Sequence, residues 1–166
     1  MEEKYLPKRR QEMDLTDRKI VALLQRDATL SIAEIAKRVN LSPTPCWKRI
    51  QRLEARGVIQ RRVAIADPQA LGLGLTAFVA IETADHSADW LARFAERVSA
   101  MPEVMELYRM AGEVDYLLRV VLPDMAAYDA FYKRLIEAAP LKNVTSSFAM
   151  ERIKATTAYP VDDETA

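Results

Sequence analysis

The sequence predicts an α+β protein in which an N-terminal winged helix-turn-helix domain precedes a C-terminal ferredoxin-like βαββαβ domain. Apolar residues first recur at a helical period and, after residue 75, in alternating strand and helix patterns. Asp67-Pro68 and two closely spaced glycines, Gly72 and Gly74, interrupt the chain between these patterns. The charge changes at the same place, since residues 1–66 hold 15 Lys and Arg against 8 Asp and Glu, and residues 67–166 hold 9 against 16. We therefore expect domains at 1–66 and 75–160, a linker at 67–74 and a tail at 161–166.

The composition indicates a globular protein, because half of the 166 residues are apolar and 29% are charged. No apolar run approaches the ~20 residues of a membrane-spanning helix, and the charged N-terminus lacks the apolar region of a secretory signal. One cysteine and one histidine predict no disulfide, no metal site and no cofactor. These features are typical of a cytoplasmic protein, and we expect no membrane contact.

Three short helices are expected between residues 14 and 56. Thr16 is expected to cap the first helix. The second begins with Ser31 and Glu34 at the spacing of a capping box. The third begins in the Ser-Pro-Thr-Pro stretch, with either Ser42 or Thr44 as its cap, because proline is tolerated in a first helical turn. The tight turn between the second and third helices predicts a helix-turn-helix.

The third helix and the segment after it carry the residues expected of a major-groove reader. Gly57 ends the helix, and Val58–Ile65 has the composition of a wing strand. The predicted contacts to double-stranded DNA are Ser31, Ser42, Thr44, Pro45, Lys48, Arg49, Arg52, Arg61 and Arg62. A three-helix bundle with a solvated cationic face is the alternative interpretation. The basic stretch at residues 8–10 is expected to be a flexible arm.

The acidic half predicts four strands and two helices in the order β-α-β-β-α-β. They are expected at Leu75–Thr83, Ala88–Ala100, Val104–Met110, Val114–Leu122, a helix capped by Asp124 and ended by Pro140, and Asn143–Thr157. Two helices cover one face of such a sheet. Both faces of the first strand are apolar, with Val79 and Ile81 on one and Phe78 on the other. A second copy of the domain is the simplest cover for the other face, which predicts a homodimer.

Four stretches of the chain now point to one family. They read LTDRKIVALLQRDATLSIAEIAKRVNLSPTPCWKRIQRLEARGVIQ, DPQALGLGLTAFVAI, AGEVDYLLRVVLPDMAAYDAFYKRL and TSSFAMERIKATTAYP. Along nearly its whole length the chain resembles the Lrp/AsnC (leucine-responsive, feast–famine) transcriptional regulators. The resemblance implies a DNA-binding domain, a ligand-sensing domain, dimers that often assemble further into octamers, and small effectors that are usually amino acids.

The resemblance also implies an effector site between sensing domains. It assigns this site to Gly112, Glu113 and Asp115 of the hairpin turn and to Thr145, Ser146 and Ser147 of the last strand. The chemistry is consistent, because turn amides can meet a carboxylate, Asp115 can pair with an ammonium group, and hydroxyls can satisfy either. Any hairpin favours a glycine, however, and Thr-Ser-Ser fits any amphipathic strand.

Three functions remain to be compared. The leading hypothesis is a regulator that binds a pseudo-palindromic operator and responds to an effector. The second is a ligand-independent architectural DNA-binding protein of the nucleoid. The third, an enzyme on a ferredoxin-like scaffold, is disfavoured because the sequence shows no nucleophile–base arrangement and no phosphate loop, so no catalytic residue is predicted. Cys46 is expected to be a small core residue. Trp47 lies beside the inward stripe and is expected to pack on the wing strand, with a contact to the sugar-phosphate backbone as the alternative.

Overall fold

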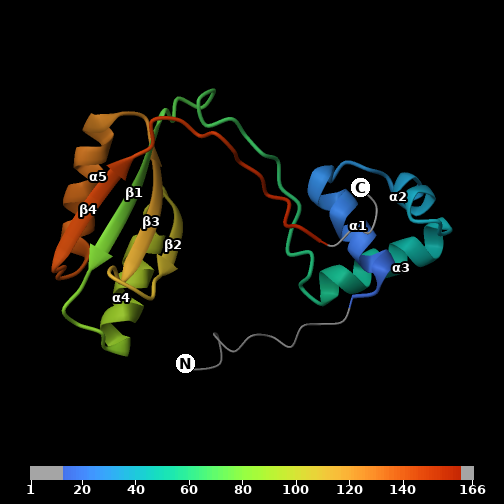
Figure 1. The fold of residues 1–166 in the computed structure, drawn as a ribbon, viewed down its shortest axis with the longest axis horizontal. Coiled ribbons are helices and arrows are strands. Elements are labelled where there is room, and N and C mark those ends of the chain that lie inside the picture. The colour runs from blue at the N-terminus through green and yellow to red at the C-terminus, as the bar shows by residue number, and fades with distance from the viewer. Residues whose placement is uncertain (1–12, 162–166) are drawn as a thin grey trace. The chain divides into compact units, whose positions relative to one another are not determined.

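A computed structural model describes residues 13–161 and divides into two units (Figure 1). In the described range, the first unit holds residues 13–64 and 154–161, and the second holds residues 65–153. These units differ from the expected boundaries at two places. Residues 65–74 group with the second unit, and residues 154–160 group with the first. The basic stretch at residues 8–10 and residues 162–166 of the expected tail lie outside the described residues.

The first unit contains three helices, α1 (Leu15–Arg26), α2 (Ile32–Arg38) and α3 (Pro43–Ala55). The expected cap of α1 at Thr16 is wrong, because the helix begins at Leu15, two residues earlier than a Thr16 cap would place it, and Asp14 is its N-cap. The Asp14 carboxylate accepts the backbone N–H of Asp17 at 2.8 Å. A carboxylate at this end of a helix also interacts favourably with the helix dipole.

The turn between α2 and α3 follows the sequence signals. The capping box of Ser31 and Glu34 is confirmed in both directions. Asn40 adopts a φ of 55° in the turn, and Ser42 rather than Thr44 is the N-cap of α3, without a side-chain cap hydrogen bond. Gly57 ends α3 at a φ of 70°, a backbone conformation that glycine adopts without strain. A helix-turn-helix results, closed over Ile20, Ile35, Cys46, Ile50 and Leu53.

The strand expected at Val58–Ile65 does not form. Val58 and Ile59 donate their backbone N–H groups to the Leu53 carbonyl at the end of α3, and the chain then continues in extended form. Val63 and Ile65 are largely exposed. A β-strand needs a neighbouring strand for its hydrogen bonds, and the described part of the first unit contains none.

The C-terminal segment returns to α1 within the first unit. The Gln25 side chain donates to the Tyr159 carbonyl at 3.2 Å and accepts the Tyr159 backbone N–H at 2.8 Å. Val161 packs against the core of the three helices. The first unit is therefore built from two parts of the chain that are far apart in sequence.

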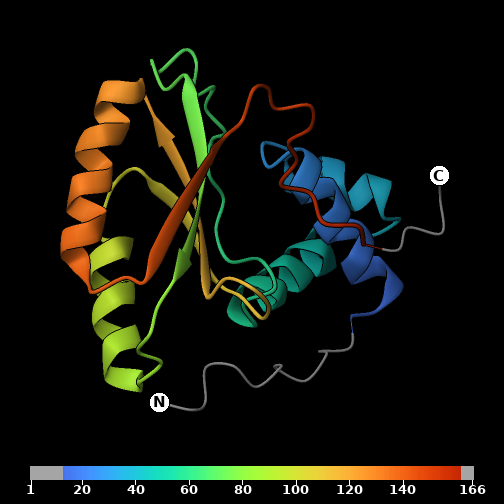
Figure 2. The same cartoon turned by 60° about the vertical axis from the view of Figure 1, so that its left-hand side comes forward.

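The second unit is a four-stranded antiparallel sheet in the order β2-β3-β1-β4. Its elements are β1 (Leu75–Glu82), α4 (Ala88–Ser99), β2 (Val104–Arg109), β3 (Tyr116–Leu122), α5 (Met125–Ala138) and β4 (Asn143–Phe148). Both helices lie on one face of the sheet (Figure 2). This order and topology confirm the ferredoxin-like βαββαβ fold.

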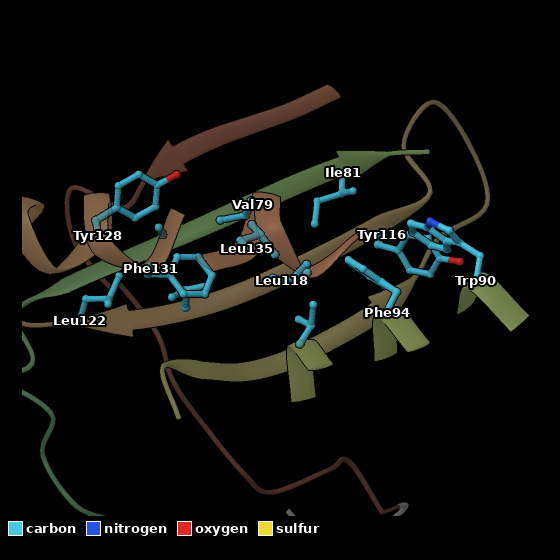
Figure 3. Close-up of a cluster of buried hydrophobic side chains, with 14 residues drawn as sticks. Val79, Ile81, Trp90, Phe94, Tyr116, Leu118, Leu122, Tyr128, Phe131 and Leu135 are labelled. Atoms are coloured by element: carbon cyan, nitrogen blue, oxygen red, sulfur yellow. The ribbon is translucent and has the colours of Figure 1, made fainter. Parts of the chain in front are cut away.

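The core of the second unit lies between the sheet and the two helices (Figure 3). Val79, Ile81 and Leu118 project from the strands and are fully buried. Phe94 of α4 and Phe131 of α5 meet them from the helices. Trp90 stacks on Phe94 with ring centroids 4.8 Å apart, so the aromatic residues at the start of α4 belong to the core.

The last strand is shorter than expected, since β4 ends at Phe148 and not at Thr157. Phe148 pairs with Ala77, and Ala149 donates its N–H to the Thr76 carbonyl, one residue from the start of β1. Because β1 begins at Leu75, it has no further residues with which the chain after Ala149 could pair. The described residues contain no helix with the length and apolar character needed to cross a membrane.

Candidate nucleic-acid interface and effector site

The outward face of α3 carries polar and cationic side chains. Thr44, Lys48 and Gln51 are exposed and follow one another at three- and four-residue intervals, which places them on one face of the helix. Ser42 and Pro45 are exposed at its N-terminal end. Ser31 is exposed at the start of α2, and its hydroxyl donates a hydrogen bond to the Glu34 carboxylate. The predicted DNA contacts from Ser31 to Lys48 therefore lie at the surface of the helix-turn-helix.

Arg49 and Arg52 differ from these residues, because each is ion-paired within the unit. Both pair with Asp17 of α1, Arg49 at 2.8 Å and Arg52 at 2.7 Å. Arg49 makes a second ion pair with Asp14 at 2.6 Å. Asp17 is 1% exposed, so these contacts compensate a buried carboxylate. This role of Asp17 was not predicted, because no local pattern in the sequence indicates which charges face its side chain.

The ion pairs also affect the charge of Asp14. Burial acts to raise the pKa of Asp14, but the hydrogen bond from the Asp17 backbone N–H and the nearby Arg49 guanidinium outweigh it and lower the pKa below its ordinary value. Asp14 is therefore charged at neutral pH and remains a partner for Arg49.

A groove of about 550 Å³ lies on the other side of α3. Trp47 and Gln51 line it from the helix, and Ile59, Arg61 and Arg62 line it from the segment that follows. Arg62 is held beside α3 by an ion pair with Glu54 at 2.9 Å. Arg61 and Arg62 thus lie next to α3 without the expected strand.

Cys46 lies on the inward face of α3 and is fully buried. Burial raises the pKa of its thiol above the ordinary value, which disfavours the reactive thiolate. The structure agrees with the expectation that Cys46 packs as a small core residue. Trp47 is 49% exposed and lines the groove together with residues 59–62, which belong to the segment where the wing strand was expected.

The predicted effector residues begin in the hairpin between β2 and β3. Gly112 has a φ of 143°, and a Cβ atom there would meet nothing within 4 Å, so the backbone conformation alone requires glycine. Glu113 follows it and is exposed. The Met110 N–H donates to the Asp115 carbonyl at 2.8 Å and closes the turn.

Asp115 joins this hairpin to the end of β1. Its backbone N–H donates to the Ile81 carbonyl at 2.9 Å, and its Oδ2 accepts the Thr83 N–H at 2.8 Å. Its Oδ1 lies 3.7 Å from His86 Nδ1. Asp115 therefore has a structural role through one oxygen and presents the other beside His86. Thr83 and His86 were not predicted for this site, because both lie in the connection between β1 and α4, about 30 residues before Asp115 in the sequence.

Side chains alternate between the two faces of the sheet along β4, so the Thr-Ser-Ser stretch does not lie on one face. Thr145 and Ser147 are exposed and lie opposite Ala80 and Phe78 of β1. Ser146 faces the helices, where its hydroxyl hydrogen-bonds to the Tyr128 hydroxyl. The structure thus places Thr145 and Ser147 on the open face of the sheet and Ser146 on the opposite face.

Comparison with known protein families gives a match for each unit. A profile described as winged helix-turn-helix DNA-binding matches residues 13–60. A profile described as Lrp/AsnC ligand binding domain matches residues 76–159. The chain belongs to the Lrp/AsnC family. The resemblance and the two-part fold class expected from the sequence are thereby confirmed.

Individual relatives of this Lrp/AsnC protein match over most of its length. The DNA-binding transcriptional activator DecR of Escherichia coli (strain K12) is 56% identical over 151 residues, which are 90% of this chain and 99% of DecR. A crystal structure of an AsnC family transcriptional regulator from Agrobacterium tumefaciens has 59% identity and a TM-score of 0.86, with 89% of this chain and 97% of that chain covered. A transcriptional regulator of Neisseria meningitidis, solved as a complex with L-methionine, has 35% identity and a TM-score of 0.85, with coverages of 91% and 98%.

Proposed function

We propose that this protein is a sequence-specific DNA-binding transcriptional regulator whose DNA binding responds to an amino acid. The observation that carries the proposal is the combination of two sites in one chain. A helix-turn-helix presents Thr44, Lys48 and Gln51 to solvent, and a ligand-binding unit presents an Asp115 oxygen beside a glycine turn. Duplex DNA lies in the cytoplasm of bacteria and archaea, which is the proposed site of action.

The effector contacts follow from the chemistry of a zwitterion. Asp115 Oδ1 suits an ammonium group, because Oδ2 already accepts the Thr83 N–H. The backbone amides around Gly112 and Glu113 suit a carboxylate. Thr145 and Ser147 offer hydroxyls on the open face, whereas Ser146 is bonded to Tyr128. The L-methionine complex of the Neisseria relative supports an amino acid as the ligand class.

A homodimer formed through the open face of the sheet completes the proposal. Phe78 is 40% exposed on that face although it lies at the centre of β1. Leu117 and the Arg119–Glu106 ion pair, at 2.7 Å, lie on neighbouring strands. A dimer would bring two α3 helices to one duplex and require a pseudo-palindromic operator. Assembly of such dimers into octamers remains part of the proposal.

Thermal denaturation of the full chain with each of the twenty amino acids tests the effector site. A specific ligand at a hundredfold excess over its dissociation constant stabilises the native state by about 2.7 kcal/mol. Asp115→Asn retains an oxygen for the Thr83 N–H and removes the charge, so we expect it to fold and to lose this stabilisation. Asp129→Asn changes an exposed acid of α5 and is the matched control. Equal stabilisation of wild type and Asp115→Asn would contradict the site. No response to any amino acid would favour a ligand-independent architectural protein.

A further inference from the structure

The carboxylate of Asp17 is the most deeply buried charge in the described part of the first unit. Each of its oxygens receives a different arginine of α3. Oδ1 accepts from Arg49 at 2.8 Å, and Oδ2 accepts from Arg52 at 2.7 Å. The same Arg49 nitrogen also donates to Asp14 at 2.6 Å. We call these four residues the Asp17 cluster.

The cluster connects one side of α3 to the start of α1. A buried carboxylate without a cationic partner is strongly unfavourable, so Asp17 holds both arginines in place. Arg49 and Arg52 are three residues apart, on adjacent turns of one side of the helix. Cys46, Ile50 and Leu53 fix the back of α3 in the core. The two sets of contacts together define the rotation of α3 about its axis.

We infer that Asp17 is a positioning residue for DNA recognition, and that Arg49 and Arg52 orient α3 instead of contacting DNA. This inference rests on the proposed DNA-binding function and assigns roles within that site. Arg49 and Arg52 were expected from the sequence to contact DNA, and the inference gives them a different role.

The remaining outward face of α3 is then the base-reading surface. At about 100° per residue, Lys48 lies between the directions of Thr44 and Arg52 and projects away from the core. Gln51 lies on the same outward face and hydrogen-bonds to Glu54 at 3.0 Å. Lysine suits the acceptors of guanine, glutamine the paired groups of adenine, and threonine the methyl group of thymine. Thr44, Lys48 and Gln51 can therefore distinguish bases without either arginine.

The experiment uses the full chain and duplexes selected from a pool with a randomised centre. Wild type, Asp17→Asn, Arg52→Met, Arg52→Lys and Gln51→Ala are each used for selection, and affinity for the wild-type consensus is measured over a range of salt concentrations. Asp27→Asn, which changes an exposed acid after α1, is the matched control for Asp17→Asn. Circular dichroism and thermal melting show that each variant is folded at the binding temperature.

The positioning role predicts a loss of affinity without a change of specificity. Asp17→Asn and Arg52→Met should weaken binding about tenfold for all tested duplexes, while the selected consensus and the salt dependence stay those of wild type. Arg52→Lys should recover part of the loss because it retains a charge for Asp17. Gln51→Ala should change the selected bases. If Asp17→Asn does not fold, Arg52→Met and Arg52→Lys still give the same comparison.

Two results would overturn the inference. The first is a change in how Arg52→Met binds DNA. If this variant lowers the slope of log affinity against log salt concentration by about one, or changes the selected bases, Arg52 contacts DNA directly. Wild-type affinity of folded Asp17→Asn would show that the cluster does not position α3 for recognition. Failure of the wild-type chain to enrich any sequence would instead refute sequence-specific DNA binding itself, and the inference with it.

Discussion

Phe78→Ala on the open face of the sheet should weaken the proposed homodimer strongly. A phenylalanine side chain has about 200 Å² of surface, and Phe78 is 40% exposed in a single chain. About 80 Å² is therefore available to a partner, which corresponds to about 2 kcal/mol at 25 cal/mol per Å². A two-fold interface contains Phe78 twice, so the loss is about 4 kcal/mol and the dimer dissociation constant should rise about 1,000-fold.

Sedimentation equilibrium over a range of protein concentrations measures this change. Phe148→Ala is a matched control, because Phe148 is 39% exposed but lies on the helix side of the sheet, edge-on to Tyr128 at 4.9 Å. The control should lower the melting temperature and leave the dimer intact. An unchanged dimer dissociation constant in Phe78→Ala, or an equal effect of both substitutions, would refute an interface on the open face.

Three other predictions concern stability. Gln25→Ala removes both hydrogen bonds to the Tyr159 backbone and should destabilise the first unit by about 1–2 kcal/mol in urea unfolding, while an unchanged midpoint would mean that the C-terminal segment does not contribute. Phe131→Ala empties a fully buried site and should cost about 3–5 kcal/mol, measured by the same method on the second unit's transition. The pKa values of Asp14 and of Glu34, which accepts hydrogen bonds from Ser31, lie below their ordinary 3.8 and 4.5. Their contribution to the free energy of unfolding is therefore complete above those ordinary values and is lost as the pH falls through the lower pKa values of the folded state. The double variant Asp14→Asn, Glu34→Gln should consequently lose less stability than wild type when urea unfolding is measured at decreasing pH.

Local signals explain why most helices and strands could be predicted from the sequence. The capping box at Ser31, the Asp124 cap of α5 and the glycine at position 57 each act within a few residues of the element that they begin or end. The burial pattern of the strands depends only on alternation along the chain. Element order then leaves few topologies, and the ferredoxin-like sheet is one of them.

Features that depend on distant partners could not be predicted in this way. Val58–Ile65 has the composition of a strand, but strand formation depends on a neighbour that the described unit does not provide. The end of β4 depends on where β1 begins, and the return of Tyr159 to α1 depends on an amide 134 residues away. The same holds for the functional sites. Arg49 was identified as a cation on α3, but its partner Asp17 lies 32 residues earlier.

The central claim is that an amino acid bound to the second unit changes DNA binding by the first. The most direct measurement is the affinity of the full chain for its selected duplex with and without the amino acid that stabilises it. We expect that ligand to change the dissociation constant about 5- to 150-fold, and Asp115→Asn to bind the duplex with wild-type affinity and show no response. A ligand that stabilises the protein but leaves DNA affinity and assembly unchanged would contradict the claim.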